Sequence, residues 1–158
     1  MAVKHLYLLL SMLFIPSEEV GGAEPEPVSV AYAAENRNLL DNQTVAIYGI
    51  LVVEFENIAV YPSREAVEHA RNKAERQAIW IDPALLKNYT EEEYEIYKKK
   101  RAVLTKFHLT CVIITGPFSA SGRGHMSLYD AEIGGYADVK ESSLCDGGKK
   151  REAGDVGS

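Results

Sequence analysis

The sequence of 158 residues is poor in the residue types that build metal centres and catalytic sites. It holds two cysteines and four histidines, and none of the spacings H-x-x-x-H, H-x-H or C-x-x-C occurs. A zinc site needs three or four closely spaced ligands of these kinds, so no motif implies a metal or another cofactor. A G-x-S-x-G turn is also absent, which leaves a nucleophilic triad without support. A non-enzymatic role is therefore favoured.

The chain also has fewer basic residues than acidic residues. The chain has 17 Lys and Arg residues against 23 Asp and Glu residues, a net charge of −6. Nucleic-acid binding depends on clustered Lys and Arg that release counterions, so this balance disfavours a nucleic-acid partner. The basic cluster at 98–101 follows the acidic cluster at 91–95, an order that complements a helix dipole.

Long apolar runs are missing except near the amino terminus. Residues 6–15 form a ten-residue apolar run behind a basic start, and small residues follow up to Ala23. A bilayer span needs about 20 residues, so this layout predicts a signal peptide over residues 1–23. Its removal takes away Lys4, Glu18 and Glu19 and changes the net charge from −6 to −5. We expect a periplasmic or secreted protein that contacts a membrane only through an uncleaved signal segment.

Two interpretations of the cysteines stay open. In an exported protein Cys111 and Cys145 can pair, closing a loop of about 35 residues and stabilising the fold by about 3–4 kcal/mol in the chain-entropy model. Alternatively, Cys111 is a small apolar core residue on a strand.

Hydrophobic alternation and turn residues predict a domain at 40–140 built from strands and two helices. Thr90 and Glu93 have the spacing of a capping box. The flanks are an extended lead-in at 24–39, where two prolines prevent an early helix, and a disordered tail at 146–158. The predicted strands are 44–56, 58–62, 78–82, 107–120 and 127–139, and the predicted helices are about 63–76 and 90–104.

The fold class follows from the long strands. Residues 44–49 are apolar on both faces, and the pattern V-x-I-x-G occurs at 45–49 and again at 112–116. We interpret these as two barrel strands that bend at Gly49 and Gly116. The prediction is a mainly β protein with inserted helices, an OB-like five-stranded, partly closed barrel. The alternative is an open α+β sheet.

Several motifs together resemble a family of small bacterial proteins, many of them exported, that have no assigned activity. They are "VAIYGILVVEFENIAVYPSREA", "AIWID" and "VIITGPFSASGRGHMSLYDAEI". The resemblance covers about residues 40–137, implies an OB-like domain and implies no substrate. The charged helix at about 90–103 is a departure from the family pattern. The matched positions are Glu54, Glu56, Tyr61, Trp80, Gly116, Phe118, Gly124 and His125.

Glu54, Glu56 and His125 are the candidate metal ligands. The two glutamates lie two residues apart and project from one strand face, and His125 and Asp130 join them if the first and last hairpins meet. The alternative is that the glutamates belong to a solvated strand. His125 would then start the last strand, and its ring nitrogens would hold backbone groups of the "EFEN" turn through hydrogen bonds.

Five aromatic residues are candidate ligand contacts on the barrel face, since aromatic platforms bind sugars, bases or peptides. The alternative is that most of them fill the core. The favoured function is an exported binding or accessory module whose partner is an envelope protein, a peptide or an oligosaccharide. A metal-binding protein or metal-dependent hydrolase and a single-stranded nucleic-acid binder are the alternatives. The aromatic candidates are Tyr48, Tyr61, Trp80, Phe118 and Tyr129.

Overall fold

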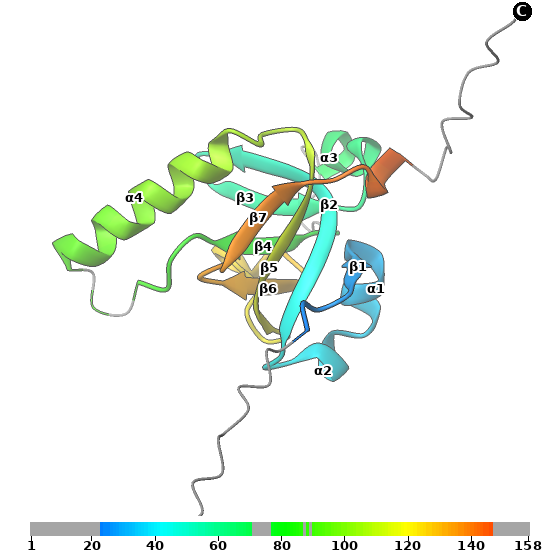
Figure 1. Cartoon of the computed structure of the whole chain (residues 1–158), viewed down its shortest axis with the longest axis horizontal. Helices are drawn as coiled ribbons and strands as arrows, with labels where there is room; N and C mark the ends of the chain where they lie inside the picture. Colours follow the sequence, from blue (N-terminus) through cyan, green and yellow to red (C-terminus); the bar gives the residue numbers. More distant parts are fainter. Residues whose placement is uncertain (1–22, 71–76, 87, 89, 147–158) are drawn as a thin grey trace, which may run out of the picture.

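The computed structural model describes residues 23–70, 77–86, 88 and 90–146, and its centre is a closed barrel (Figure 1). The barrel order is β2-β3-β4-β6-β5, and β5 pairs back with β2. All neighbours are antiparallel except β4 and β6. The predicted OB-like barrel with inserted helices is confirmed, and the open sheet is wrong. The strands are β2 (Thr44–Glu54), β3 (Asn57–Tyr61), β4 (Ile79–Asp82), β5 (Cys111–Ser119) and β6 (Ala131–Gly134).

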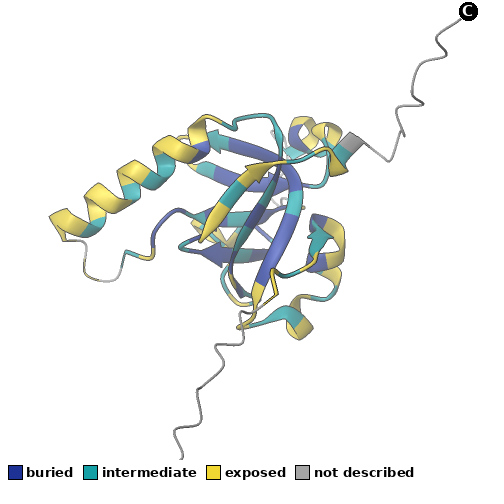
Figure 2. Cartoon of the chain, in the orientation of Figure 1, coloured by how far each residue is buried: buried dark blue, intermediate teal, exposed yellow. Residues whose placement is uncertain are grey.

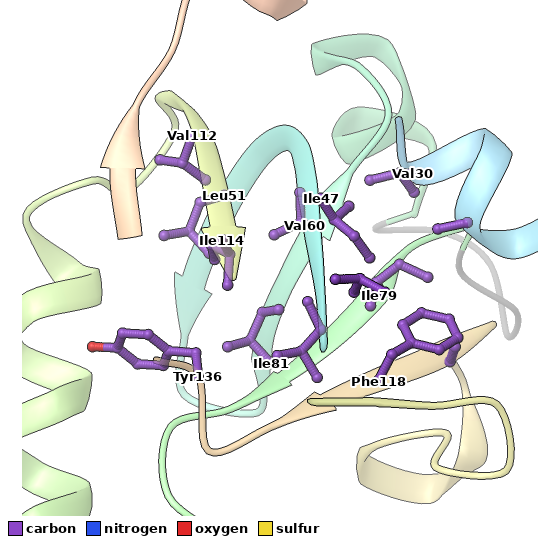
Figure 3. Packing of buried hydrophobic residues seen from close by; sticks show 14 of the residues in the cluster. Val30, Ile47, Leu51, Val60, Ile79, Ile81, Val112, Ile114, Phe118 and Tyr136 are labelled. Atoms are coloured by element: carbon purple, nitrogen blue, oxygen red, sulfur yellow. The ribbon is translucent and has the colours of Figure 1, made fainter. Parts of the chain in front are cut away.

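The barrel interior is filled by aliphatic side chains from all sides. Figure 3 shows Ile47 and Leu51 of β2 together with Ile79, Ile81 and Ile114 from the other strands. Each of these five side chains is completely buried. Full burial of such a side chain is worth about 1.5–3 kcal/mol, so the closed barrel is the main source of stability.

A second cluster lies on the outside of the barrel and explains why β2 is apolar on both faces. Ile50 and Val52 point outward there and pack with Tyr61 and with Val67 of α3 (Arg64–Ala70). The outer face of β2 is therefore covered by a helix, as a strand with two apolar faces requires.

Gly49 and Gly116 lie where the two longest strands change neighbours. On one edge of β2, β1 (Pro27–Ser29) pairs with residues 46–48, and β3 takes over from Ile50. On one edge of β5, β7 (Asp138–Glu141) pairs with residues 112–115, and β6 takes over from Phe118. A side chain at either glycine would collide with the incoming segment. The predicted bends thus mark two equivalent exchanges of partner.

The lead-in is not extended as predicted. Besides β1 it forms two short helices, α1 (Val30–Glu35) and α2 (Arg37–Leu40). Val30 and Ala33 are buried in the core. The two prolines precede the helix, and the Ser29 hydroxyl accepts a hydrogen bond from Tyr32 N at 3.1 Å as an N-cap. The chain can therefore start a helix immediately after the prolines.

Both predicted domain helices begin close to where the capping residues place them. The Ser63 hydroxyl accepts from Ala66 N at 3.2 Å at the start of α3, while residues 71–76 of the predicted helix lie outside the described residues. In α4 (Glu91–Thr105) Thr90 and Glu93 form the predicted capping box, with distances of 3.2 and 3.1 Å. Figure 2 shows that α4 is exposed over most of its length.

The prediction of one strand over 127–139 is wrong. The segment holds β6 and the start of β7, separated by residues 135–137, of which Gly135 has a φ of +63°. Residues 127–130 belong to the loop between β5 and β6, which contains a short 3-10 turn, η1 (His125–Ser127). His125 therefore starts this turn and not the last strand, and apolar alternation alone does not reveal such a break.

Cys111 and Cys145 are joined by a disulfide with a Cα–Cα distance of 5.9 Å. The bond fastens η2 (Leu144–Asp146) to the first residue of β5. Residues 1–22 and 147–158, which hold most of the predicted signal peptide and tail, lie outside the described residues.

Candidate functional site

The candidate site is the outer face of β3 and β4, between the β2–β3 turn and the β5–β6 loop at residues 120–130. In OB-like barrels these strands and these two loops bind ligands. On β4, Ile79 and Ile81 point into the barrel, so Trp80 and Asp82 point outward. The same alternation leaves Glu132 of β6 on the outer side, in register with Trp80.

Trp80 is half-buried beneath the β5–β6 loop. Gly124 lies so close that a Cβ there would be 2.3 Å from the Trp80 Cγ atom. The rings of Trp80 and Tyr129 are 5.0 Å apart between centroids and inclined by 52°. Trp80 thus lies between the loop backbone and a buried tyrosine, which fixes the orientation of its ring.

The β5–β6 loop has an unusual backbone. Gly124 has a φ of +59°, and the non-glycine residues Met126 and Ser127 follow at +56° and +58°. Arg123 fastens the loop, because its Nε donates to Tyr129 O at 2.9 Å and its carbonyl accepts from Tyr129 N at 3.3 Å. Non-glycine residues at positive φ carry strain that concentrates at ligand and functional sites. This loop is therefore a constrained segment placed over Trp80.

A polar contact connects the two sides of the site. The Asn57 side-chain oxygen accepts hydrogen bonds from the Tyr61 hydroxyl at 2.9 Å and from the Tyr129 hydroxyl at 3.0 Å. Asn57 begins β3 directly after the turn, and Tyr129 ends the β5–β6 loop. The hydroxyl groups of the two buried tyrosines thereby have a hydrogen-bond partner. The same contact holds the β2–β3 turn and the β5–β6 loop together.

The structure places the five aromatic candidates in two groups. Tyr61, Phe118 and Tyr129 are buried, with exposed fractions of 1%, 2% and 1%, so they are core residues and do not line an open groove. Trp80 and Tyr48 are half-buried. The proposed aromatic contact surface is thus reduced to Trp80 at this face, because the two tyrosines and the phenylalanine fill space between strands.

His125 and Glu56 come together across the site, with 3.9 Å between His125 Nε2 and Glu56 Oε2. The predicted approach of His125 to the "EFEN" turn is therefore present, but its partner is a carboxylate and not the backbone. Glu54 instead accepts from Asn57 Nδ2 at 3.3 Å. Within the described residues no group of three or more His, Cys, Asp or Glu residues could hold a metal ion.

Another histidine performs the backbone contact that was predicted for His125. His108 Nδ1 accepts a hydrogen bond from Val53 N at 3.0 Å, so it fastens the segment before β5 to the edge of β2. This contact joins residues 55 positions apart. A lone histidine beside Phe107 and Leu109 gives no sequence signal for such a partner.

Two carboxylates at the face were not among the predicted site residues. Burial raises the pKa of Asp82 to about 6. The hydrogen bond that its carboxylate accepts from Ala84 N at 3.1 Å acts in the opposite direction and lowers the pKa. The charge of Glu132 raises the Asp82 pKa further, and Lys100 lowers it. Burial also raises the pKa of Glu132, and the Gly124 N–H, at 3.4 Å, lowers it. The sequence alone does not show that Asp82 and Glu132 share this face, because their proximity depends on the pairing of β4 with β6.

A separate hollow lies at the disulfide. It has a volume of about 330 Å³ between the start of α3 and the segments β5 and β7. Arg64 and Glu65 on one side and Thr110 and Glu141 on the other supply polar groups. None of the sequence-predicted ligand or metal residues lines it, and the two cysteines form part of its wall.

No family model, curated protein or solved structure matches this chain. Within the described part of the chain, every helix is too short or too polar to cross a lipid bilayer.

Proposed function

We propose that the chain is an exported, non-enzymatic binding module whose ligand face lies at Trp80 of β4, between the β2–β3 turn and the β5–β6 loop. The observation that carries this proposal is the half-buried Trp80, oriented between Gly124 of the β5–β6 loop and the Tyr129 ring. The part of the indole that these neighbours leave uncovered offers an apolar surface beside polar groups. The resemblance to small exported bacterial proteins supports export and an OB-like domain.

Charge at this face favours an oligosaccharide over a nucleic acid. Glu132 lies in register with Trp80, and Glu56 stands on the neighbouring turn. These carboxylates repel a phosphate backbone, whereas sugar hydroxyls can donate hydrogen bonds to them while a sugar ring packs against the exposed part of the indole. A neutral oligosaccharide is therefore the ligand class that we propose. A peptide or an envelope protein would contact the same apolar surface through a side chain in place of a sugar ring.

The fluorescence of Trp80 provides a direct test, because it is the only tryptophan in the chain. Purified protein is titrated with a panel of soluble neutral oligosaccharides, and the emission is followed. We expect a saturable change in emission with at least one oligosaccharide, because a bound sugar displaces water from the exposed part of the indole. Single-stranded DNA at moderate salt should produce no saturable change.

The matched variants are Glu132→Gln at the face and Glu141→Gln on β7. Glu132→Gln should weaken oligosaccharide binding by about tenfold through loss of a charged acceptor, and Glu141→Gln should leave it unchanged. The proposal fails if no oligosaccharide alters the emission, or if both variants bind like the parent protein. Saturable DNA binding would instead favour the nucleic-acid alternative.

A metal-binding function is a second candidate, because His125 and Glu56 approach one another. Metal analysis of the purified protein tests it. A stoichiometric metal that is lost in His125→Ala would support this candidate, and a metal-free protein after incubation with divalent cations would count against it.

A further inference from the structure

We propose that α4 is a self-association surface, which pairs with α4 of a second copy in antiparallel orientation. This proposal is independent of the oligosaccharide proposal. It begins from the placement of α4 beside the barrel, with its amino-terminal end farthest from the strands (Figure 1).

The helix has little contact with the rest of the chain for its length. It runs for 15 residues, or roughly 22 Å, and Leu104 near its end is its only buried residue. The contacts that attach it to the barrel are also near this end. Lys100 Nζ donates to Tyr136 O at 2.7 Å, the Tyr136 hydroxyl donates to Lys100 O at 2.9 Å, and Arg101 donates to Glu54 O at 3.2 Å.

A stripe of exposed residues runs along one face of α4. Glu92, Ile96, Lys99 and Val103 follow one another at intervals of four, three and four residues, all of them exposed. This is the spacing of a helix–helix seam. Ile96 and Val103 expose 44% and 40% of their surface. Exposed apolar side chains at seam spacing indicate a partner helix.

The charge pattern identifies this partner as a second copy in antiparallel orientation. The first half of α4 is acidic, and the second half is basic. Antiparallel pairing around Ile96 places each acidic half beside the basic half of the other copy. Parallel pairing would place like charges together, which is unfavourable. A two-fold interface of this kind is closed and self-complementary.

The contact is small, so the dimer should be weak and salt-dependent. A pair of short helices lies at the low end of the range of protein interfaces, and exposed ion pairs are screened by salt. Sedimentation equilibrium of the purified protein should therefore show reversible dimers at high concentration and low salt. The dimers should dissociate at about 1 M salt.

Reciprocal charge changes provide a decisive test. One variant carries Glu92→Lys with Glu95→Lys, and the other carries Lys98→Glu with Lys99→Glu. Each variant alone should self-associate about tenfold more weakly or worse, and an equimolar mixture should form a heterodimer.

Three controls separate association from folding. Far-UV circular dichroism should show unchanged helix content in each variant. Ile96→Asp should abolish dimers, whereas Lys140→Glu on β7 should leave them intact. The proposal is overturned if the protein is monomeric at every concentration, which would leave α4 for another partner. It is also overturned if either double variant still forms dimers on its own, or if a mixture of the two double variants forms no heterodimer.

Discussion

At the scale of single residues, Asp82 is a carboxylate whose charge is unfavourable in the folded state. It lies on the outer side of β4, and burial raises its pKa to about 6, with a further contribution from the charge of Glu132. The Ala84 N–H and Lys100 act in the opposite direction. An aspartate in the unfolded chain titrates near 3.9. The folded protein therefore binds this proton more tightly than the unfolded chain does.

This difference predicts how stability depends on pH. The contribution of Asp82 is favourable below about pH 4 and is lost as the pH rises through about 6, because the unfolded state then binds fewer protons than the folded state. Asp82→Asn keeps an oxygen that can accept from Ala84 N and removes the charge. We expect the variant to be more stable than the parent at about pH 7 and to lose this advantage near about pH 4.

Urea unfolding at both pH values measures the effect as a shift of the midpoint. Glu141→Gln on the exposed strand β7 is the control and should show no such pH-dependent difference. An Asp82→Asn variant with equal gains at both pH values, or a less stable variant at about pH 7, would contradict the assignment.

At the scale of elements, the β5–β6 loop depends on the missing side chain of Gly124. Two effects coincide there, a φ of +59° and a Cβ position 2.3 Å from Trp80 Cγ. Gly135 has a similar φ of +63°, but the nearest atom to its Cβ position is 3.6 Å away. An alanine at Gly135 would therefore suffer only backbone strain, whereas an alanine at Gly124 would suffer both strain and a collision. Comparing the two substitutions separates these effects.

Gly124→Ala should lower the free energy of unfolding by about 2–3 kcal/mol, since it combines strain with a collision against the indole. Gly135→Ala should lower it by about 1 kcal/mol through strain alone. Chemical unfolding measures both values, and the Trp80 emission should shift only in Gly124→Ala. Equal losses in the two variants would show that the loop is not held against Trp80.

The elements also show what a sequence can predict. Long segments such as β2 and α4 carry many residues of one pattern and recognisable caps, so they could be recognised directly. The helix α1 has only six residues, too few for a clear period, and depends on the burial of Val30 and Ala33 in a core formed by distant strands. The split between β6 and β7 depends on one backbone angle at Gly135. The site is less predictable still, because Glu132 and Trp80 become neighbours only through the parallel pairing of β4 with β6.

At the scale of the whole molecule, closure of the barrel depends on Gly49 and Gly116. Each lies where one edge of a long strand passes from a peripheral strand to a barrel strand, and both belong to the β2–β5 pair that closes the barrel. The collisions that a Cβ would cause are different. At Gly49 it would lie 2.4 Å from the Tyr61 carbonyl oxygen, which is backbone, and at Gly116 it would lie 2.6 Å from Ile133 Cγ2, a side-chain atom.

This difference predicts unequal effects of the same substitution. Alanine is ordinarily better than glycine in a strand by about 0.5–1 kcal/mol, so any loss of stability measures the collision. Gly49→Ala should lower the free energy of unfolding by more than about 3 kcal/mol, since the β2–β3 pairing must move. Gly116→Ala should lower it by about 2 kcal/mol, because a side chain can rearrange.

A second substitution makes the prediction specific to the proposed cause. Ile133→Leu removes the Cγ2 methyl while keeping the volume, and alone it should cost less than about 1.5 kcal/mol. Combined with Gly116→Ala, it should destabilise by less than the sum of the two single effects, and combined with Gly49→Ala it should be additive. Additivity at both glycines would mean that contact with Ile133 is not the reason why Gly116→Ala is destabilising. The collision would then be with the backbone near Tyr136, whose Cα would lie 3.0 Å from the new methyl group.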